Sequence, residues 1–144
     1  MRRGLIARSL TELPDAVFDA RLARVRAAMH EARCDALIIY TNNTRPAGVS
    51  WLTGFIPYWS EALLVVPHEA APYLVAALSF RVKPWIERVS YIGEVLHTPR
   101  IGLKAAQEIA RALPDASVGI VEFDALPAGI ATDLHGRKIG RAHV

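Results

Sequence analysis

The chain has 144 residues, of which 52% are hydrophobic and 22% charged, as in one ordinary globular domain. Its longest apolar runs, Ala62–Val66 and Tyr73–Leu78, are too short to cross a bilayer, and no secretory signal follows the basic start. We therefore expect a cytoplasmic protein with no membrane partner. Arg137, Lys138 and Arg141 account for the whole net charge of +3, so the neutral remainder predicts no nucleic-acid partner.

The first predicted element is an amphipathic helix from Pro14 to about Ala32. Proline followed by an acidic residue suits a first helical turn. One apolar stripe then recurs at helical spacing and consists of Phe18, Leu22, Val25 and Met29.

Strand patterns dominate the next part of the chain. Ala36–Thr41 is continuous, apolar and partly β-branched, which predicts a buried strand. A loop of turn residues, 42–48, and a short element, Val49–Thr53, follow it. Ala62–Val66 and Pro72–Ala77 are two more strands joined by a hairpin-length connection. Because no helix separates these two strands, we expect a mixed sheet rather than a purely parallel one.

Helical and strand patterns alternate in the second half. The predicted elements are a helix over Val82–Val89, a strand over Tyr91–Leu96, a helix over Gly102–Leu113, a strand over Val118–Phe123 and a last helix from Pro127. Strands separated by helical patterns predict an α/β domain over residues 1–136, in which helices flank a mixed central sheet as layers.

The last eight residues, 137–144, have no apolar periodicity. We expect a basic tail that is disordered or foreign to the natural protein. Ile139–Val144 is also what one frame of a common sequencing-adapter oligonucleotide translates to, which favours the second explanation.

The sequence carries no recognisable catalytic or metal-binding motif. Its histidines are isolated, its single cysteine, Cys34, can form neither an internal disulfide nor a cysteine-based zinc site, and no glycine-rich phosphate loop occurs. Ser50 is followed by Leu52 where a nucleophile elbow needs glycine. Glu122 and Asp124 would share a face at a strand end and could bind a cation, although solvated or capping acids are the more ordinary explanation. We predict no catalytic residue and no metal ligand.

One loop is unusual in composition. The segment Phe55-Ile-Pro-Tyr-Trp-Ser-Glu61 places three aromatic residues and an acid between regular elements. Loops normally lose aromatic residues to the core, so this loop either packs down or contacts a substrate or a partner subunit. Both interpretations stay open from the residues alone.

Three motifs, in this order, resemble one family. Cys34–Ile39 is similar to the strand written GLDALLV, Trp51–Phe55 to the YLTGF signature, and Gly119–Pro127 to the GVEFDSLP end. Together they resemble the N-terminal domain of the creatinase/prolidase family (aminopeptidase P, M24-type metallopeptidases) from about Ala16 to Leu134. The resemblance implies the layered fold of that domain, with its ribonuclease H-like motif. Arg33 stands where the family often has glycine, so the first helix would lack its usual glycine cap.

The resemblance also implies a supporting role. In the family this domain mediates homo-oligomer contacts and lends a loop to a substrate pocket, often that of a neighbouring subunit. The matching loop here is Phe55–Glu61. We expect aromatic and acidic side chains to face substrate above a phenylalanine base, and two arginines to meet an anionic substrate group. These candidate residues are Tyr58, Trp59 and Glu61, then Phe55 as the base, and Arg45 and Arg81.

The catalytic domain of the family is missing from this sequence. That domain holds a dinuclear divalent metal centre with two aspartates, one histidine and two glutamates, and metal-assisted hydrolysis needs those ligands. We therefore expect the non-catalytic N-terminal domain of a truncated Xaa-Pro peptidase or creatinase-type hydrolase, whose partner is the missing C-terminal catalytic domain. A free-standing small-molecule-binding or oligomerisation module is the alternative. An unrelated α/β domain that binds a nucleotide or an anion is a third hypothesis.

Overall fold

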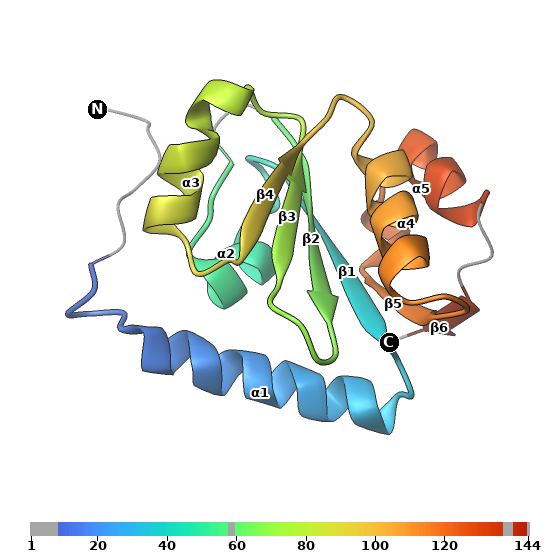
Figure 1. Ribbon diagram of the computed structural model, residues 1–144, viewed down its shortest axis with the longest axis horizontal. Helices are drawn as coiled ribbons and strands as arrows, with labels where there is room; N and C mark the ends of the chain where they lie inside the picture. Colours follow the sequence, from blue (N-terminus) through green and yellow to red (C-terminus); the bar gives the residue numbers. More distant parts are fainter. Residues whose placement is uncertain (1–8, 58–59, 137–139, 144) are drawn as a thin grey trace.

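A mixed sheet lies at the centre of the computed structural model, with helices on both faces (Figure 1). The structure describes residues 9–57, 60–136 and 140–143. The strands are β1 Ala36–Thr41, β2 Ala62–Pro67, β3 Tyr73–Ala76, β4 Glu94–His97, β5 Ser117–Val121 and β6 Gly140–His143. The helices are α1 Asp15–Glu31, α2 Ala47–Thr53, α3 Lys83–Val89, α4 Ile101–Ala112 and α5 Ala128–His135, with 3₁₀ turns at Phe80–Val82 and Phe123–Ala125.

Strand order in the described sheet is β4-β3-β2-β1-β5-β6. β2 runs antiparallel to both of its neighbours, β1 and β3, whereas the other neighbouring pairs are parallel. A hairpin forces antiparallel pairing, while the connections through α3 and α5 allow parallel pairing. The prediction of a mixed sheet in an α/β domain with helices as layers is confirmed.

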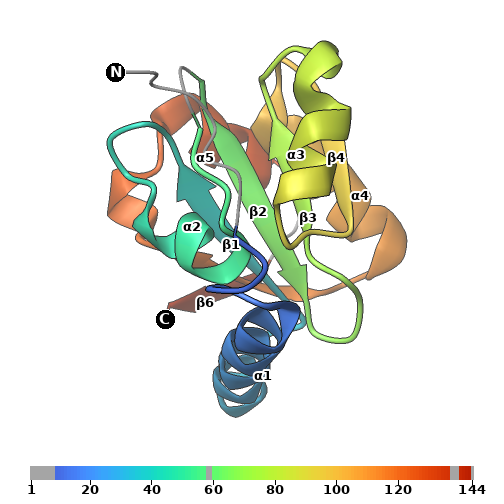
Figure 2. The ribbon, with the colours of Figure 1, turned by 90° about the vertical axis from the view of Figure 1, so that its left-hand side faces the viewer.

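The two faces of the sheet bury two separate clusters. Along β1, Leu37 and Ile39 point to the cluster that includes residues of α1, α2 and α3. Ala36 and Ile38 point to the other cluster, with α4 and α5. Figure 2 shows α2 and α3 on the near side of the sheet and α4 and α5 on the far side. Because successive side chains alternate between two covered faces, β1 is apolar on both faces from Ala36 to Ile39.

Helix α1, with 17 residues, follows the predicted stripe, since Phe18, Leu22 and Met29 are buried. The helix ends in a Schellman motif, in which the Cys34 backbone N–H donates to the Met29 carbonyl oxygen at 2.9 Å. Arg33 takes the left-handed position of this motif, with φ 54°. An arginine therefore occupies a position that favours glycine. In the described ranges no helix is long and apolar enough to cross a membrane.

The end of β5 differs from the prediction. The strand stops at Val121, because Glu122 adopts a left-handed conformation (φ 51°, ψ 50°) and a 3₁₀ turn follows it. Glu122 and Asp124 are therefore not alternate residues of one strand, and the expectation that they share a strand face is wrong. β4 also begins later than predicted, at Glu94, because pairing with β3 starts there and residues 91–93 form an irregular connection after α3.

The end of the chain lies at the edge of the sheet. Gly140–His143 forms β6, which pairs in parallel with Ser117–Ile120 of β5. The expectation that residues 137–144 are a disordered or foreign tail stays a prediction. Strand pairing uses backbone groups, so an open sheet edge can accept a segment that has no apolar pattern.

Candidate functional site at the carboxyl edge of the sheet

Four chain segments meet at one edge of the sheet, which we call the carboxyl edge. Thr41, the last residue of β1, pairs with Ala62, the first residue of the antiparallel β2. Ala62 pairs in turn with Ala76, the last residue of β3. On the other side Ile39 pairs with Val121 at the end of β5. The segments before β2 and after β1, β3 and β5 therefore lie along this edge.

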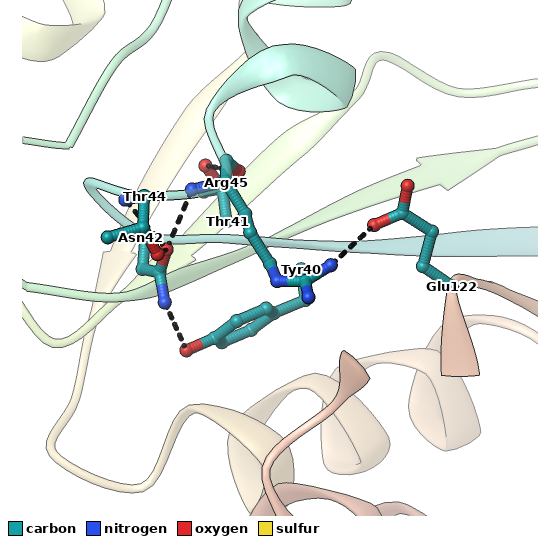
Figure 3. Close-up of polar contacts among 6 residues, drawn as sticks. All are labelled: Tyr40, Thr41, Asn42, Thr44, Arg45 and Glu122. Carbon is teal, nitrogen blue, oxygen red and sulfur yellow. Dashed lines mark hydrogen bonds and ion pairs between the residues drawn. The ribbon is translucent and has the colours of Figure 1, made fainter. Parts of the chain in front are cut away.

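The loop after β1 is held in shape by Asn42 (Figure 3). Its Oδ1 accepts hydrogen bonds from the Thr44 backbone N–H at 3.0 Å, from Thr44 Oγ1 at 2.8 Å and from the Arg45 backbone N–H at 2.9 Å. The buried Thr41 hydroxyl donates to the Arg45 carbonyl oxygen at 3.1 Å. An asparagine side chain that replaces backbone partners in this way is typical of a tight, ordered turn.

Tyr40 connects this loop to the segment before β2. Its hydroxyl accepts from Asn42 Nδ2 at 3.2 Å and donates to Glu61 Oε2 at 2.8 Å. Burial, and then the hydrogen bond to Glu61, raise the pKa of Tyr40 above its ordinary value, so the phenol stays a donor at neutral pH. One oxygen of the half-buried Glu61 carboxylate is therefore held in place by the strand beside it.

Arg45 and Glu122 face each other across the ends of β1 and β5. Arg45 Nη1 and Glu122 Oε2 are 3.5 Å apart, and both side chains are largely exposed, at 54% and 69%. Such a pair contributes little stability, so either charge is available to another partner. Beside it, Arg45, Gly48 and Glu122 line a cavity of about 260 Å³. The chain leaves β1 toward one face of the sheet and β5 toward the other, and such a crevice is where open α/β sheets bind ligands.

The structure brings some of the predicted residues together at this edge. Arg45 and Glu61 are joined through the loop of Asn42 and through Tyr40. Arg81 lies in the 3₁₀ turn after β3, exposed, with no ion pair among the residues described. Its backbone N–H is capped by Ser79 Oγ at 3.4 Å.

The remaining predicted residues are in other places. Phe55 is 1% exposed and belongs to the cluster under α1, α2 and α3. It therefore has no surface for a substrate, and only its predicted role as a hydrophobic base agrees with this burial. Tyr58 and Trp59 lie outside the described residues.

Sequence reasoning did not identify Tyr40 or Asn42 as site residues. Tyr40 lies in an apolar run that predicts only a strand, and Asn42 lies among turn residues that predict only a loop. A tyrosine followed two residues later by asparagine at the carboxyl end of a strand is the signal that could have indicated them, because alternate residues share one face.

The described residues contain no group of three or more His, Cys, Asp or Glu side chains that could hold a metal ion. Cys34 is buried, and its pKa is raised by burial and by the neighbouring Asp35 carboxylate, so it is neither a reactive thiol nor a ready ligand. What the carboxyl edge offers is a fixed carboxylate, two guanidinium groups and a phenol, which suits polar recognition.

Comparison with known proteins gives a family and a fold. The family model described as Creatinase/Prolidase N-terminal domain matches residues 21–139. An Xaa-Pro dipeptidase from Bacillus anthracis superimposes with a TM-score of 0.68 at 15% identity, over 88% of this chain and 33% of that one. The present chain thus spans about a third of that dipeptidase. No curated protein matches the chain in sequence.

Two further solved structures are similar over nearly their whole length. The N-terminal domain of the cytoplasmic peptidase PepQ from Mycobacterium tuberculosis H37Rv has a TM-score of 0.66 at 20% identity, over 87% of this chain and 92% of that one. The aminopeptidase P, an Xaa-Pro aminopeptidase, from Streptococcus thermophilus has a TM-score of 0.67 at 13% identity, over 88% and 91%. At these identities the likeness concerns the fold.

Proposed function

Since this chain belongs to the creatinase/prolidase N-terminal domain family, we propose that it is the non-catalytic N-terminal domain of a metal-dependent hydrolase of the Xaa-Pro peptidase or creatinase type. The observation that carries the proposal is the family match over residues 21–139, which takes in almost every described element of the fold. The full-length relative from Bacillus anthracis, an Xaa-Pro dipeptidase, continues well beyond the part that this chain matches.

The hydrolytic metal belongs to the part of the enzyme that this sequence does not contain. A dinuclear divalent metal would activate water in the C-terminal domain. The described residues here offer no ligand set for it. In this proposal the domain contributes binding, assembly or both.

The carboxyl edge is the surface that we assign to the substrate pocket. Xaa-Pro substrates carry an ammonium group at one end and, in dipeptides, a carboxylate at the other. Glu61, fixed by Tyr40, suits the first group, while Arg45 and Arg81 suit the second. Tyr58 and Trp59 stay candidates for contact with the substrate.

Assembly is the second part of the proposal. The partners are the C-terminal catalytic domain and a second copy of the chain. Phe80, which follows β3 at the carboxyl edge and is 65% exposed, is an apolar side chain that such a contact would cover. We place the enzyme in the cytoplasm, as the description of the Mycobacterium tuberculosis relative supports.

Sequencing the source DNA through and beyond the codon for Gly136 is the first test. A frame that continues into a domain with two aspartates, one histidine and two glutamates agrees with the proposal. A natural stop codon after Val144 contradicts it and favours the free-standing module.

Steady-state kinetics of the protein with its catalytic domain then test the assignment of the carboxyl edge to the substrate pocket. Arg45→Ala and Glu61→Gln should each lower kcat/KM for an Xaa-Pro dipeptide by roughly tenfold or more, because each removes a charge from substrate binding. Arg111→Ala is the matched control, since Arg111 is also an exposed arginine in a surface ion pair, 2.7 Å from Glu108, but lies in the last turn of α4. Equal effects at Arg45 and Arg111 would rule out the assignment of this edge.

A further inference from the structure

A second cavity lies at the opposite edge of the sheet. It has a volume of about 470 Å³ and lies between the last turn of α4 and the hairpin that joins β2 to β3. The start of β1 and the end of β2 complete its walls. None of the residues assigned above to the substrate pocket lines this cavity.

The walls of this cavity are mainly aliphatic. Val65 and Ile109 close the base of the cavity as buried side chains, 0% and 2% exposed, and the half-buried Pro67 and Leu113 supply apolar surface that a ligand can reach. Cavities of about 300 to 1,000 Å³ with apolar walls and a few polar groups are typical of small-molecule sites. An occupant should therefore have a compact apolar body.

Two carboxylates at the cavity lack a cationic partner among the residues described. Asp35 accepts a hydrogen bond from the neutral Ser117 backbone N–H at 2.8 Å, and Glu69 is exposed and forms no ion pair there. Arg111, in the last turn of α4, is already bound to Glu108 through Nε at 3.2 Å and Nη2 at 2.7 Å. Arg26, from α1, donates to the carbonyl oxygens of Pro67 and Ala70 in the wall. Two carboxylates stand against this guanidinium, so the net charge at the cavity is negative.

The carboxyl end of α4 adds to the negative electrostatic potential at the cavity. Ala112 and the capping residue Leu113 line the cavity, and the last carbonyl groups of a helix carry partial negative charge. Tyr73 also lines it, and its hydroxyl makes no hydrogen bond to any described residue. Burial, and then the Glu108 carboxylate, raise the pKa of Tyr73 to about 12, so at pH 7 the hydroxyl is neutral and its oxygen can accept. His68 is a further polar group of the wall.

We propose that this cavity binds a small organic cation, with a protonated or quaternary amine on a compact apolar body. The body would pack against Pro67 and Leu113, and the cationic group would face Asp35, Glu69 and the Tyr73 oxygen. A ligand carboxylate or phosphate would meet two like charges and the negative end of a helix. The proposal is independent of the function proposed above, because it concerns the other edge and the chain alone.

The test is a ¹⁵N-edited NMR titration of the purified 144-residue chain with three probes of similar size: phenethylamine, 2-phenylethanol and phenylacetate. Saturable shifts are expected at the amides of residues 68–71, 73 and 109–113, with phenethylamine roughly tenfold tighter than the alcohol and phenylacetate weakest. Absence of saturable shifts, or equal affinity for the three probes, would overturn the proposal.

Amino-acid substitutions in the cavity wall test where the probes bind. Ala112→Phe, at an exposed position, should fill the cavity and abolish the shifts. If this variant does not fold, Ala70→Phe fills the cavity from the opposite wall. Glu69→Gln should reduce the preference for the amine over the alcohol by about threefold. Glu12→Gln, an exposed acid outside the cavity, should leave that preference unchanged. Binding that survives a cavity-filling variant that folds contradicts the assignment.

Discussion

At the scale of single residues, burial decides between the two roles expected of Phe55. Its ring is enclosed in the core, whereas its neighbour Ile56 is 38% exposed. Phe55→Ala should reduce the free energy of unfolding by about 3–5 kcal/mol, because it leaves a cavity. Ile56→Ala is the adjacent control and should cost less than about 1 kcal/mol. Urea denaturation followed by circular dichroism measures both, and a small loss for Phe55→Ala would contradict its place in the core.

Tyr91 gives the protein a pH dependence in the alkaline range. Its hydroxyl donates to Asp19, and this hydrogen bond, followed by burial, raises the pKa of Tyr91 from 10.0 to about 12. The folded state therefore holds the phenolic proton more tightly than the unfolded chain. The stabilisation is complete below pH 10 and is lost as the pH rises toward 12.

The prediction is measured as a difference between two proteins. The free energy of unfolding of the natural chain minus that of Tyr91→Phe should be constant from pH 7 to about 9 and should fall between about 10 and 12. Tyr73 also has a raised pKa, near 12, and subtraction removes its contribution because both proteins keep it. A difference that does not change with pH would show that Tyr91 is not linked to Asp19 in solution.

At the scale of elements, the end of α1 carries an arginine at a left-handed position where glycine would be more stable. Arg33 is held at φ 54° by the Schellman hydrogen bonds. Arg33→Gly should stabilise the protein by about 1 kcal/mol, because glycine adopts this conformation without strain. Arg24→Gly, in the exposed middle of the same helix, should destabilise by a similar amount. Thermal melts of both variants measure the two changes in stability. A loss of stability for Arg33→Gly would contradict the assigned cap.

Helices α4 and α5 approach each other closely at Gly102. A Cβ at this position would lie 3.0 Å from the Ile130 carbonyl oxygen and 3.0 Å from Asp133 Cβ, whereas one at Gly129 would meet nothing within 4 Å. Gly102→Ala should therefore cost about 1–3 kcal/mol through steric strain, although alanine is the better helix former. Gly129→Ala should gain about 0.5–1 kcal/mol. Chemical denaturation of both variants measures the two changes in the free energy of unfolding. A gain in stability for Gly102→Ala would mean that the helices can move apart.

Most elements could be predicted from the sequence because their local pattern agrees with their environment. The stripe of Phe18, Leu22 and Met29 identifies α1, and the apolar run of Ala36–Thr41 identifies a strand covered on both faces. The end of β5 could not be predicted, since the left-handed turn at Glu122 falls on a residue type that rarely adopts it. β6 could not be predicted either, because backbone pairing leaves no trace in side-chain periodicity.

The candidate site was predicted only in part for a similar reason. Arg45 and Glu61 were indicated only by the family resemblance, through its substrate-pocket loop and its anionic substrate group. The link between them depends on the pairing of β1 with β2, which brings Tyr40 beside Glu61. Tyr40 and Asn42 carry a local signal, but their connection to Glu61 could be recognised only after these strands were paired.

At the scale of the whole molecule, the segment after α5 is a test of where the domain ends. β6 covers the outer edge of β5. A chain that ends at Gly136 should therefore show faster hydrogen exchange at alternate amides of β5, whose partners would be lost. Exchange read by NMR or mass spectrometry in β3, on the far side of the sheet, is the internal control. Unchanged exchange in β5 would mean that the tail does not pair in solution.

The position of β1 in the sheet has a consequence for synthesis on the ribosome. β1 can pair with β2 early, but its parallel neighbour β5 follows roughly 80 residues later in the chain. At about 5–20 residues per second, translation leaves one edge of this apolar strand open for roughly 4 to 16 s. During that interval the nascent domain offers an unpaired β template to chaperones and to other chains. Its yield in the cell should therefore depend on the speed of translation between these two strands as well as on its final stability.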